Sequence, residues 1–202
     1  TLGGSAFIKL AGTNFTGSLL LGHATSGTLS SASYNTGVGV EALDALTNGT
    51  SNIALGYRAL SKATSGANNT ALGRYALFDV VGGDKNTGIG DNSGKNITGD
   101  SNITIGADSG DNLTSGDGNV IIGSIDAGSA TGDNQLIIAD GVDGSVKWID
   151  GDSSGNVTFP AEIDAATLDI SGNADIDGTT NLDIVDIDGA VQIDAAFTSG
   201  VD

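Results

Sequence analysis

The sequence NIALGYRALSKATSGANNTALG, residues 52–73, holds one complete repeat and the start of the next, and this repeat decides the fold. NIALG begins at Asn52 and returns as NTALG at Asn69, 17 positions later. Weaker copies begin at Ser18 (SLLLG) and Asn134 (NQLII). The other full copies begin at Asn35, Asn86, Asn102 and Asn119. A short and nearly constant period indicates a solenoid, in which one small unit is stacked many times.

Each copy has the pattern of a short strand that ends in a turn. Apolar or β-branched residues alternate with small ones, which is a period of two. The fourth position is aliphatic, at Val38, Leu55, Leu72, Ile89, Ile105 and Ile122. The fifth position is glycine and predicts a tight turn or a positive φ, at Gly39, Gly56, Gly73, Gly90, Gly106 and Gly123. We expect Leu55 and Leu72 to face a core that several chains share.

The rest of the repeat predicts further contacts between coils. Ala-Leu pairs at 42–43, 59–60 and 76–77 predict a second buried position, and a coil of this length leaves room for two or three short strands with corners. Like residues of stacked coils lie about 4.8 Å apart. The asparagines are therefore expected to form a hydrogen-bonded ladder, from Asn35, Asn52, Asn69 and Asn86 onward. The alternative is that they are ordinary turn formers, but their recurrence at one phase favours the ladder.

The composition argues against an ordinary globular domain. Glycine accounts for 33 of the 202 residues, aromatic residues make up 4%, and neither Cys nor Met occurs. Large side chains are scarce, so one thin coil buries little apolar area. Disorder is the alternative, but regularly spaced apolar residues favour a fold. We infer that several chains pack side by side, and a homotrimer is the preferred number.

The charge balance restricts the possible partners. Seven Lys and Arg stand against 25 Asp and Glu, which gives a formal net charge of −18. Nucleic acid and an anionic membrane face are therefore poor partners. The sequence also has no apolar run of the length that a membrane-spanning helix needs, so we expect no insertion into a membrane.

The texture of the sequence divides the chain into four segments. Residues 1–17 are expected to be a lead-in strand segment, and residues 18–139 the stacked repeat. Residues 140–160, which contain Trp148, are expected to form a transition hairpin. Residues 161–202 are expected to form a thinner, acidic β-rich stalk in which glycine recurs every 11 positions, at Gly178, Gly189 and Gly200. The predicted fold class is thus an all-β, repetitive parallel β-helix or β-roll followed by a stalk.

The phrase N-[TI]-[GA]-[VIL]-G, followed by Ala-Leu and a Thr/Ser/Gly corner, resembles the head repeats of trimeric autotransporter adhesins and related repeats in phage tail fibres. The resemblance covers residues 18–139 and implies a left-handed parallel β-roll, a homotrimer and a role in adhesion. The period here is longer than the usual head repeat. Residues 179–200 are similar to Asp-rich segments of marine phage fibres, and no heptad pattern is present, so we favour a virion fibre.

Residues that could carry chemistry are few. The single histidine, His23, has no second His or Cys for a metal site or a triad. Asp150, Asp152, Ser154 and Gly155 match the start of an EF-hand loop, but its twelfth position is Ala161 and the match fails. Acidic pairs such as Asp175 with Asp177 and Asp186 with Asp188 lie in a uniform pattern that marks no catalytic pocket. We expect no enzyme activity and no cofactor, with loosely bound calcium in the acidic stalk as the one exception.

The sequence thus favours a structural fibre protein of a phage particle, located in the virion. Its expected partners are two further copies of itself, other virion proteins and a host-surface glycan or protein. A bacterial trimeric surface adhesin or extracellular filament subunit is the alternative. A polysaccharide-degrading tailspike is a third possibility.

Overall fold

The computed structural model describes residues 8–12, 15–22, 30–160 and 163, which belong to one compact unit (residues 1–163). The expected stalk, apart from residue 163, lies outside the described residues, as does His23. The described strands are β1 (Ile8–Gly12), β2 (Phe15–Leu21), β3 (Ala32–Ser33), β4 (Thr36–Val38), β5 (Ile53–Leu55), β6 (Thr70–Leu72), β7 (Thr87–Ile89), β8 (Ile103–Ile105), β9 (Val120–Ile122), β10 (Leu136–Ala139), β11 (Lys147–Gly151) and β12 (Val157–Thr158).

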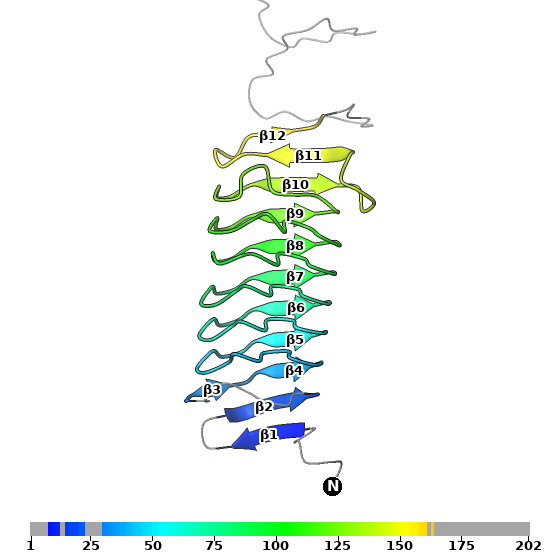
Figure 1. Cartoon of the computed structure of the whole chain (residues 1–202). Helices are drawn as coiled ribbons and strands as arrows, with labels where there is room; N and C mark the ends of the chain where they lie inside the picture. The colour runs from blue at the N-terminus through cyan, green and yellow to red at the C-terminus, as the bar shows by residue number, and fades with distance from the viewer. Residues whose placement is uncertain (1–7, 13–14, 23–29, 161–162, 164–202) are drawn as a thin grey trace, which may run out of the picture. The chain divides into compact units, whose positions relative to one another are not determined.

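These strands form one sheet that follows the chain from coil to coil (Figure 1). From β2 through β4 to β10 the neighbours pair in parallel, and like positions of successive repeats lie opposite each other, as Leu55 does with Leu72. At the two ends, β1 pairs antiparallel with β2, and β11 and β12 add antiparallel strands after β10. The described residues contain no helix. The predicted all-β solenoid, with a coil of about 17 positions, is confirmed.

From β4 to β10 each coil contributes one strand to the sheet, where the sequence pattern allowed two or three. The rest of the coil is a series of bends in which residues with positive φ recur, such as Arg58 (57°) and Leu60 (50°). A left-handed residue interrupts an extended strand. The bends are nevertheless bonded to the next coil, as in Leu60 N–H to Ala76 O at 3.1 Å.

The middle residue of each three-residue strand points into the core. Ala54, Ala71 and Ile121 are fully buried, and so are the Ala-Leu pairs that were expected to form the second buried position. The aliphatic residues at the fourth position lie on the other side of the sheet: Leu55 is 50% exposed, and Leu72 and Ile89 are half-buried. Within one chain these aliphatics therefore do not face the core, because side chains alternate across a strand and the inward places are taken by Ala, Gly, Thr and Ile. The expectation that they face a core shared by several chains stays a prediction.

The core keeps its volume by exchanging large and small side chains between facing positions. Leu77 lies where a Cβ on Gly88 would come within 2.7 Å of its Cγ, so that strand position has to be glycine. In the next coils the order is reversed. A Cβ on Gly94 would come within 2.8 Å of the Thr104 hydroxyl, which fills the space instead. The interior therefore stays filled although the individual coils differ.

Buried asparagines form the expected ladder along the rod. The Nδ2 of Asn52 donates to Asn35 Oδ1 at 3.0 Å and to Gly66 O at 2.7 Å, and the same pattern recurs in later coils. All of these asparagines are fully buried: Asn35, Asn52, Asn69, Asn86, Asn102 and Asn119. Because buried amides are costly unless hydrogen-bonded, this column fixes the register of one coil on the next.

In the two weak copies of the repeat, a residue other than asparagine occupies the ladder position. Ser18 takes the asparagine position in the first coil, since its hydroxyl accepts from Asn35 N–H at 2.8 Å. In the last coil the ladder position is Gln135, whose Nε2 donates to Asn119 Oδ1 at 3.0 Å. Asn134 is instead exposed, with a φ of 53°. The copy expected to start at Asn134 therefore starts one residue later.

Candidate functional site

One wall of the rod is an apolar surface that the described residues leave partly uncovered. It consists of the outward residues of β4 to β10 and is called here the outer sheet face. Ile53, Leu55 and Ile103 are 46%, 50% and 38% exposed, and the other aliphatic residues of this face are half-buried. Its aliphatic members include Val38, Ile53, Leu55, Leu72, Ile89, Ile103, Ile105, Val120, Ile122, Leu136 and Ile138. A continuous exposed apolar patch marks a surface for association.

A second surface follows the strands at their carboxyl ends and combines aromatic rings with cations. We call it the basic belt. It consists of Tyr57, Arg58, Lys62, Arg74, Tyr75, Phe78 and Lys95. These side chains come from three successive coils. Each lies shortly after the closing glycine of its own coil, so all of them lie on the same side of the rod. Stacking then brings them to one level after another, about 4.8 Å apart.

The rings of the basic belt pack edge to face. Tyr75 lies 5.3 Å from Tyr57 and 5.3 Å from Phe78 between ring centroids, with interplanar angles of 83° and 76°. Three cations approach the Tyr75 ring: the Arg58, Arg74 and Lys95 groups lie 5.8, 5.4 and 5.5 Å from its centroid. Aromatic pairs and cation–π contacts of this kind hold the side chains in place at a surface.

Carboxylates of the neighbouring coils neutralise part of the basic belt. Arg58 pairs with Glu41, Lys62 with Asp79, and Arg74 with Asp91 at 2.7 Å. The hydrogen bond that Arg58 donates to the Glu41 carboxylate raises the pKa of Arg58. The Tyr75 hydroxyl, and then burial, raise the pKa of Tyr57. All four members of the Arg58 and Arg74 pairs remain partly exposed, so each pair is worth little to stability.

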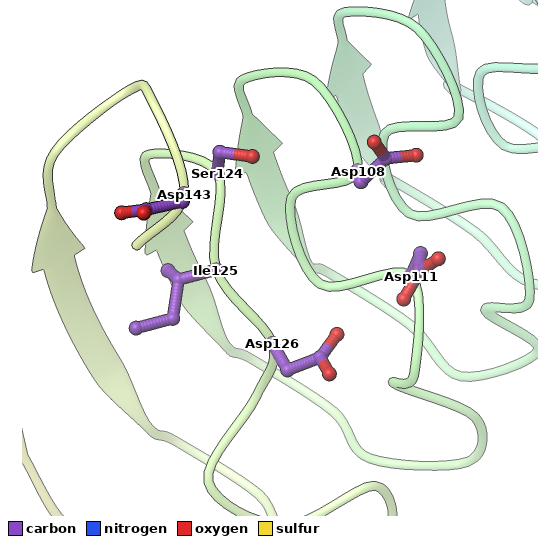
Figure 2. Close-up of a pocket in the computed structure, with 6 residues that line it drawn as sticks. All are labelled: Asp108, Asp111, Ser124, Ile125, Asp126 and Asp143. Carbon is purple, nitrogen blue, oxygen red and sulfur yellow. The ribbon is translucent and has the colours of Figure 1, made fainter. Parts of the chain in front are cut away.

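A third feature is an acidic hollow further along the rod (Figure 2). It encloses about 450 Å³ and is lined by Asp108, Asp111, Ser124, Ile125, Asp126 and Asp143. Burial, followed by a hydrogen bond to Asp126, raises the pKa of Asp111 to about 6. The described residues contain no group of three or more His, Cys, Asp or Glu arranged to hold a metal ion. The hollow therefore brings several carboxylates together, and the cost of ionising Asp111 beside Asp126 is seen in its raised pKa.

The segment that resembles the start of an EF-hand forms tight turns instead. Asp152 closes the turn between β11 and β12, since its Oδ1 accepts from the N–H groups of Ser154 and Asn156 at 2.9 and 3.0 Å. The Asn156 side chain lowers the pKa of Asp152. Asp150 pairs with Lys147 at 2.8 Å. These carboxylates are occupied by local contacts, which agrees with the failed match to a calcium loop.

Asp140 stabilises the corner that reverses the chain between β10 and β11. Its two oxygens accept hydrogen bonds from the N–H groups of Val142, Asp143, Gly144 and Val146, at 2.8 to 3.3 Å. These bonds, led by that of Val146, lower the pKa of Asp140 to about 2. One ionised aspartate thus ends the series of parallel coils.

The structural residues of the repeat all lie where the stacking brings like positions together. The asparagines form the ladder, the fourth-position aliphatics lie on the outer sheet face, and the closing glycines have φ between 116° and 141°. The acidic pairs at Asp175 and Asp186 lie outside the described residues. The basic belt was not predicted from the sequence, although a signal for it is present there: five of the seven Lys and Arg fall within residues 58–95.

Comparisons with known proteins give no relative for this chain. No family model matches it, and neither the curated proteins nor the solved structures contain a match. A search of the described residues also found no helix of the length and hydropathy needed to cross a membrane.

Proposed function

We propose that this chain is a structural fibre protein of a phage particle, assembled as a homotrimer, that projects from the virion and helps to attach it to the host surface. The proposal is supported by one observation above all. The rod carries an apolar outer sheet face on which Leu55 is 50% exposed. A thin solenoid with such a wall is more stable when copies of itself cover it, since burial of apolar area is favourable.

The outer sheet face suits a parallel assembly of identical rods. It extends over the seven strands β4 to β10, so at about 4.8 Å per strand it is roughly 30 Å long. Its register repeats at every coil, and copies side by side therefore meet like with like. In an assembly with closed cyclic symmetry, the outer sheet face of every copy is covered to the same extent. Three is the number implied by the fibres and adhesins that the repeat resembles.

Oligomeric state tests this proposal directly. Light scattering on the purified chain is expected to give three times the chain mass of 19.8 kDa. Leu55→Asp combined with Leu72→Asp should reduce the mass to that of one chain, because the charges would lie in the interface. Val142→Asp is the matched control, since Val142 is 86% exposed in the corner after β10. A parent of one chain mass, or a double variant that stays trimeric, would contradict the proposal.

The location is tested separately, with an antibody raised against residues 30–160. Labelling of virus particles in electron micrographs, at a projecting appendage, is the expected result. Labelling of bacterial cell surfaces and not of particles would favour the surface adhesin or filament. Either result leaves the oligomer experiment intact.

A further inference from the structure

The charges of this chain are strongly segregated along the sequence. Residues 58–95 contain five of the seven Lys and Arg but three of the 25 Asp and Glu, so their net charge is +2 while that of the remaining chain is −20. Four of these five cations belong to the basic belt. An anionic ligand is repelled by the acidic remainder of the chain and attracted to this segment, which directs it to one place.

The cations of the basic belt are available to a ligand. Lys95 takes part in none of the ion pairs found among the described residues. The Lys62 side chain is 52% exposed and that of Arg74 is 56% exposed. Exposed pairs contribute about 0–1 kcal/mol, so a carboxylate on a ligand can compete with Asp79 or Asp91 at low cost. A guanidinium also offers two parallel donors to a carboxylate.

The aromatic rings of the basic belt offer an apolar contact, which a small inorganic anion would not use. Tyr57 is 39% exposed beside Arg58, and Tyr75 and Phe78 are half-buried next to it. Exposed rings that are held rigidly by edge-to-face packing offer flat apolar area with a polar tip. A pyranose ring has one apolar face of C–H groups and a rim of hydroxyls, and it matches such a surface. The combination of ring and cation therefore fits a sugar that bears a carboxylate.

We propose that the basic belt binds a polysaccharide with carboxylated sugar units. This inference rests on the proposed function and names the class of host-surface molecule that the rod contacts. Arg58, Arg74 and Lys95 hold the carboxylates, and Tyr57 contacts the apolar face of a sugar ring. The coils follow each other at about 4.8 Å, which is close to the length of one sugar unit, so successive units meet successive coils.

Direct binding of purified protein tests the proposal. The probes are polygalacturonate and hyaluronate as carboxylated polymers, dextran as a neutral polymer, and poly-glutamate as an acidic polypeptide. We expect both carboxylated polysaccharides to bind, and to bind more weakly when salt shortens the Debye length from about 10 Å to about 3 Å. Dextran and poly-glutamate should bind at least tenfold more weakly.

Variants locate the site. Arg58→Asn with Arg74→Gln should weaken binding of polygalacturonate at least tenfold, and asparagine is chosen because it tolerates the φ of 57° at position 58. Lys95→Gln gives a second, single-site variant should the double variant fold poorly. Lys147→Gln removes a cation outside the basic belt and is the matched control. Its binding should equal that of the parent.

Each outcome decides the question. No binding of either carboxylated polysaccharide, equal binding of dextran or poly-glutamate, or unchanged binding by both belt variants would overturn the proposal. Failure here is distinct from failure of the fibre function, because trimer mass and particle labelling do not depend on the belt. A trimeric rod on virus particles that binds none of the probes would refute the ligand and leave the fibre.

Discussion

At the scale of single residues, a buried amide holds each coil on the next. Asn69 donates through Nδ2 to Asn52 Oδ1 and Gly83 O, at 3.1 and 2.8 Å, and its Oδ1 accepts from Asn86 N–H at 2.8 Å. The side chain is fully buried, so water cannot replace these bonds. This residue connects three coils at once.

Replacing this amide should therefore be costly. Asn69→Ala leaves Gly83 O and Asn86 N–H without partners in the interior, which we expect to lower the free energy of unfolding by about 3 kcal/mol. Asn48→Ala is the control, because Asn48 is an exposed corner residue, and a change within about 0.5 kcal/mol is expected. Denaturant unfolding followed by circular dichroism measures both. Equal effects would show that the ladder does not stabilise the rod.

Asp111 predicts an unusual dependence of stability on pH. Its folded pKa of about 6 lies above the ordinary value of 3.8, so the folded chain keeps a proton that the unfolded chain loses first. Its contribution is therefore fully present below about pH 4 and is lost as the pH rises to about 6. After solvent screening the loss is about 1 kcal/mol. Asp140 acts in the opposite sense, because its pKa is lowered to about 2, but it does so below about pH 4.

The measurement compares Asp111→Asn with the parent at pH 4.5 and pH 7. Asparagine is neutral at both values, so the variant should be more stable than the parent at pH 7, and its advantage should shrink at pH 4.5. An advantage of equal size at both values would show that folding does not raise the pKa of Asp111.

The structural role of a residue could be predicted from the sequence where its chemical type allowed only one role. The asparagine column followed from its phase alone, since buried amides must find partners. The last coil could not be placed in this way, because Asn134 and Gln135 are neighbouring amides and either fits the pattern. The inward side of β5 was equally ambiguous. Ile53, Ala54 and Leu55 are all apolar, so alternation does not say which side is buried.

At the scale of the element, the turn after each strand depends on close backbone approach. Gly56 has a φ of 138°, and a Cβ at this position would lie 2.4 Å from Gly73 O in the next coil. An L-residue there is both conformationally strained and in collision with backbone. The turn therefore needs glycine in every coil.

Gly56→Ala is expected to lower the free energy of unfolding by about 3 kcal/mol or more. Gly141→Ala is the matched control, since no atom lies within 4 Å of a Cβ built there. Thermal melting of the two variants side by side provides the test. A Gly56 variant as stable as the Gly141 variant would mean that the coils separate without cost.

The strands could be predicted from the sequence, and the bends between them could not. Period-two alternation and a closing glycine located β4 to β9 correctly. The left-handed conformations at Arg58, Leu60 and Tyr75 carry no sequence signal, because such residues favour negative φ. Stacking imposes them: their N–H and C=O groups reach the neighbouring coils only with the chain bent in this way.

At the scale of the whole molecule, neighbouring coils are interchangeable if the core is kept. Gly94 and Gly110 both meet an inward side chain of the next coil, and Ser93 and Ser109 both donate to a strand carbonyl. Deleting residues 103–119 joins Asn102 to Val120 and stacks equivalent positions again. The shortened rod should keep its β-rich circular dichroism and a cooperative melt.

Deletion of residues 103–111 is the control for this prediction. It removes about half a coil, displaces the ladder and should abolish cooperative melting, because repeats are stabilised by their neighbours. Similar melting of the two deletion variants would argue against stacking in register as the source of stability.

The surfaces of the whole rod were less predictable than its fold. The net charge of −18 describes a uniformly acidic molecule and gives no sign of the basic belt. The belt becomes apparent only from the charge of residues 58–95 taken separately and from the stacking of their coils. Tyr57 and Tyr75 are 18 positions apart in the sequence, and their contact depends on the stacking as well as on the period. The repeat in the sequence shows which position of the coil a residue occupies. Which positions of neighbouring coils come into contact depends on how the chain bends within each coil.

The backbone bonds between coils run along the rod, and this has a mechanical consequence. A force applied between the two ends of the rod breaks the backbone hydrogen bonds of one coil before those of the next. In a shear geometry, by contrast, all of these hydrogen bonds would bear the force together. Each coil that comes away frees one repeat, such as residues 52–68, which extends to about 55–60 Å. Single-molecule pulling on one chain should show steps of about this length, and one long step would contradict the expectation. Such a rod yields gradually under tension and so absorbs shock.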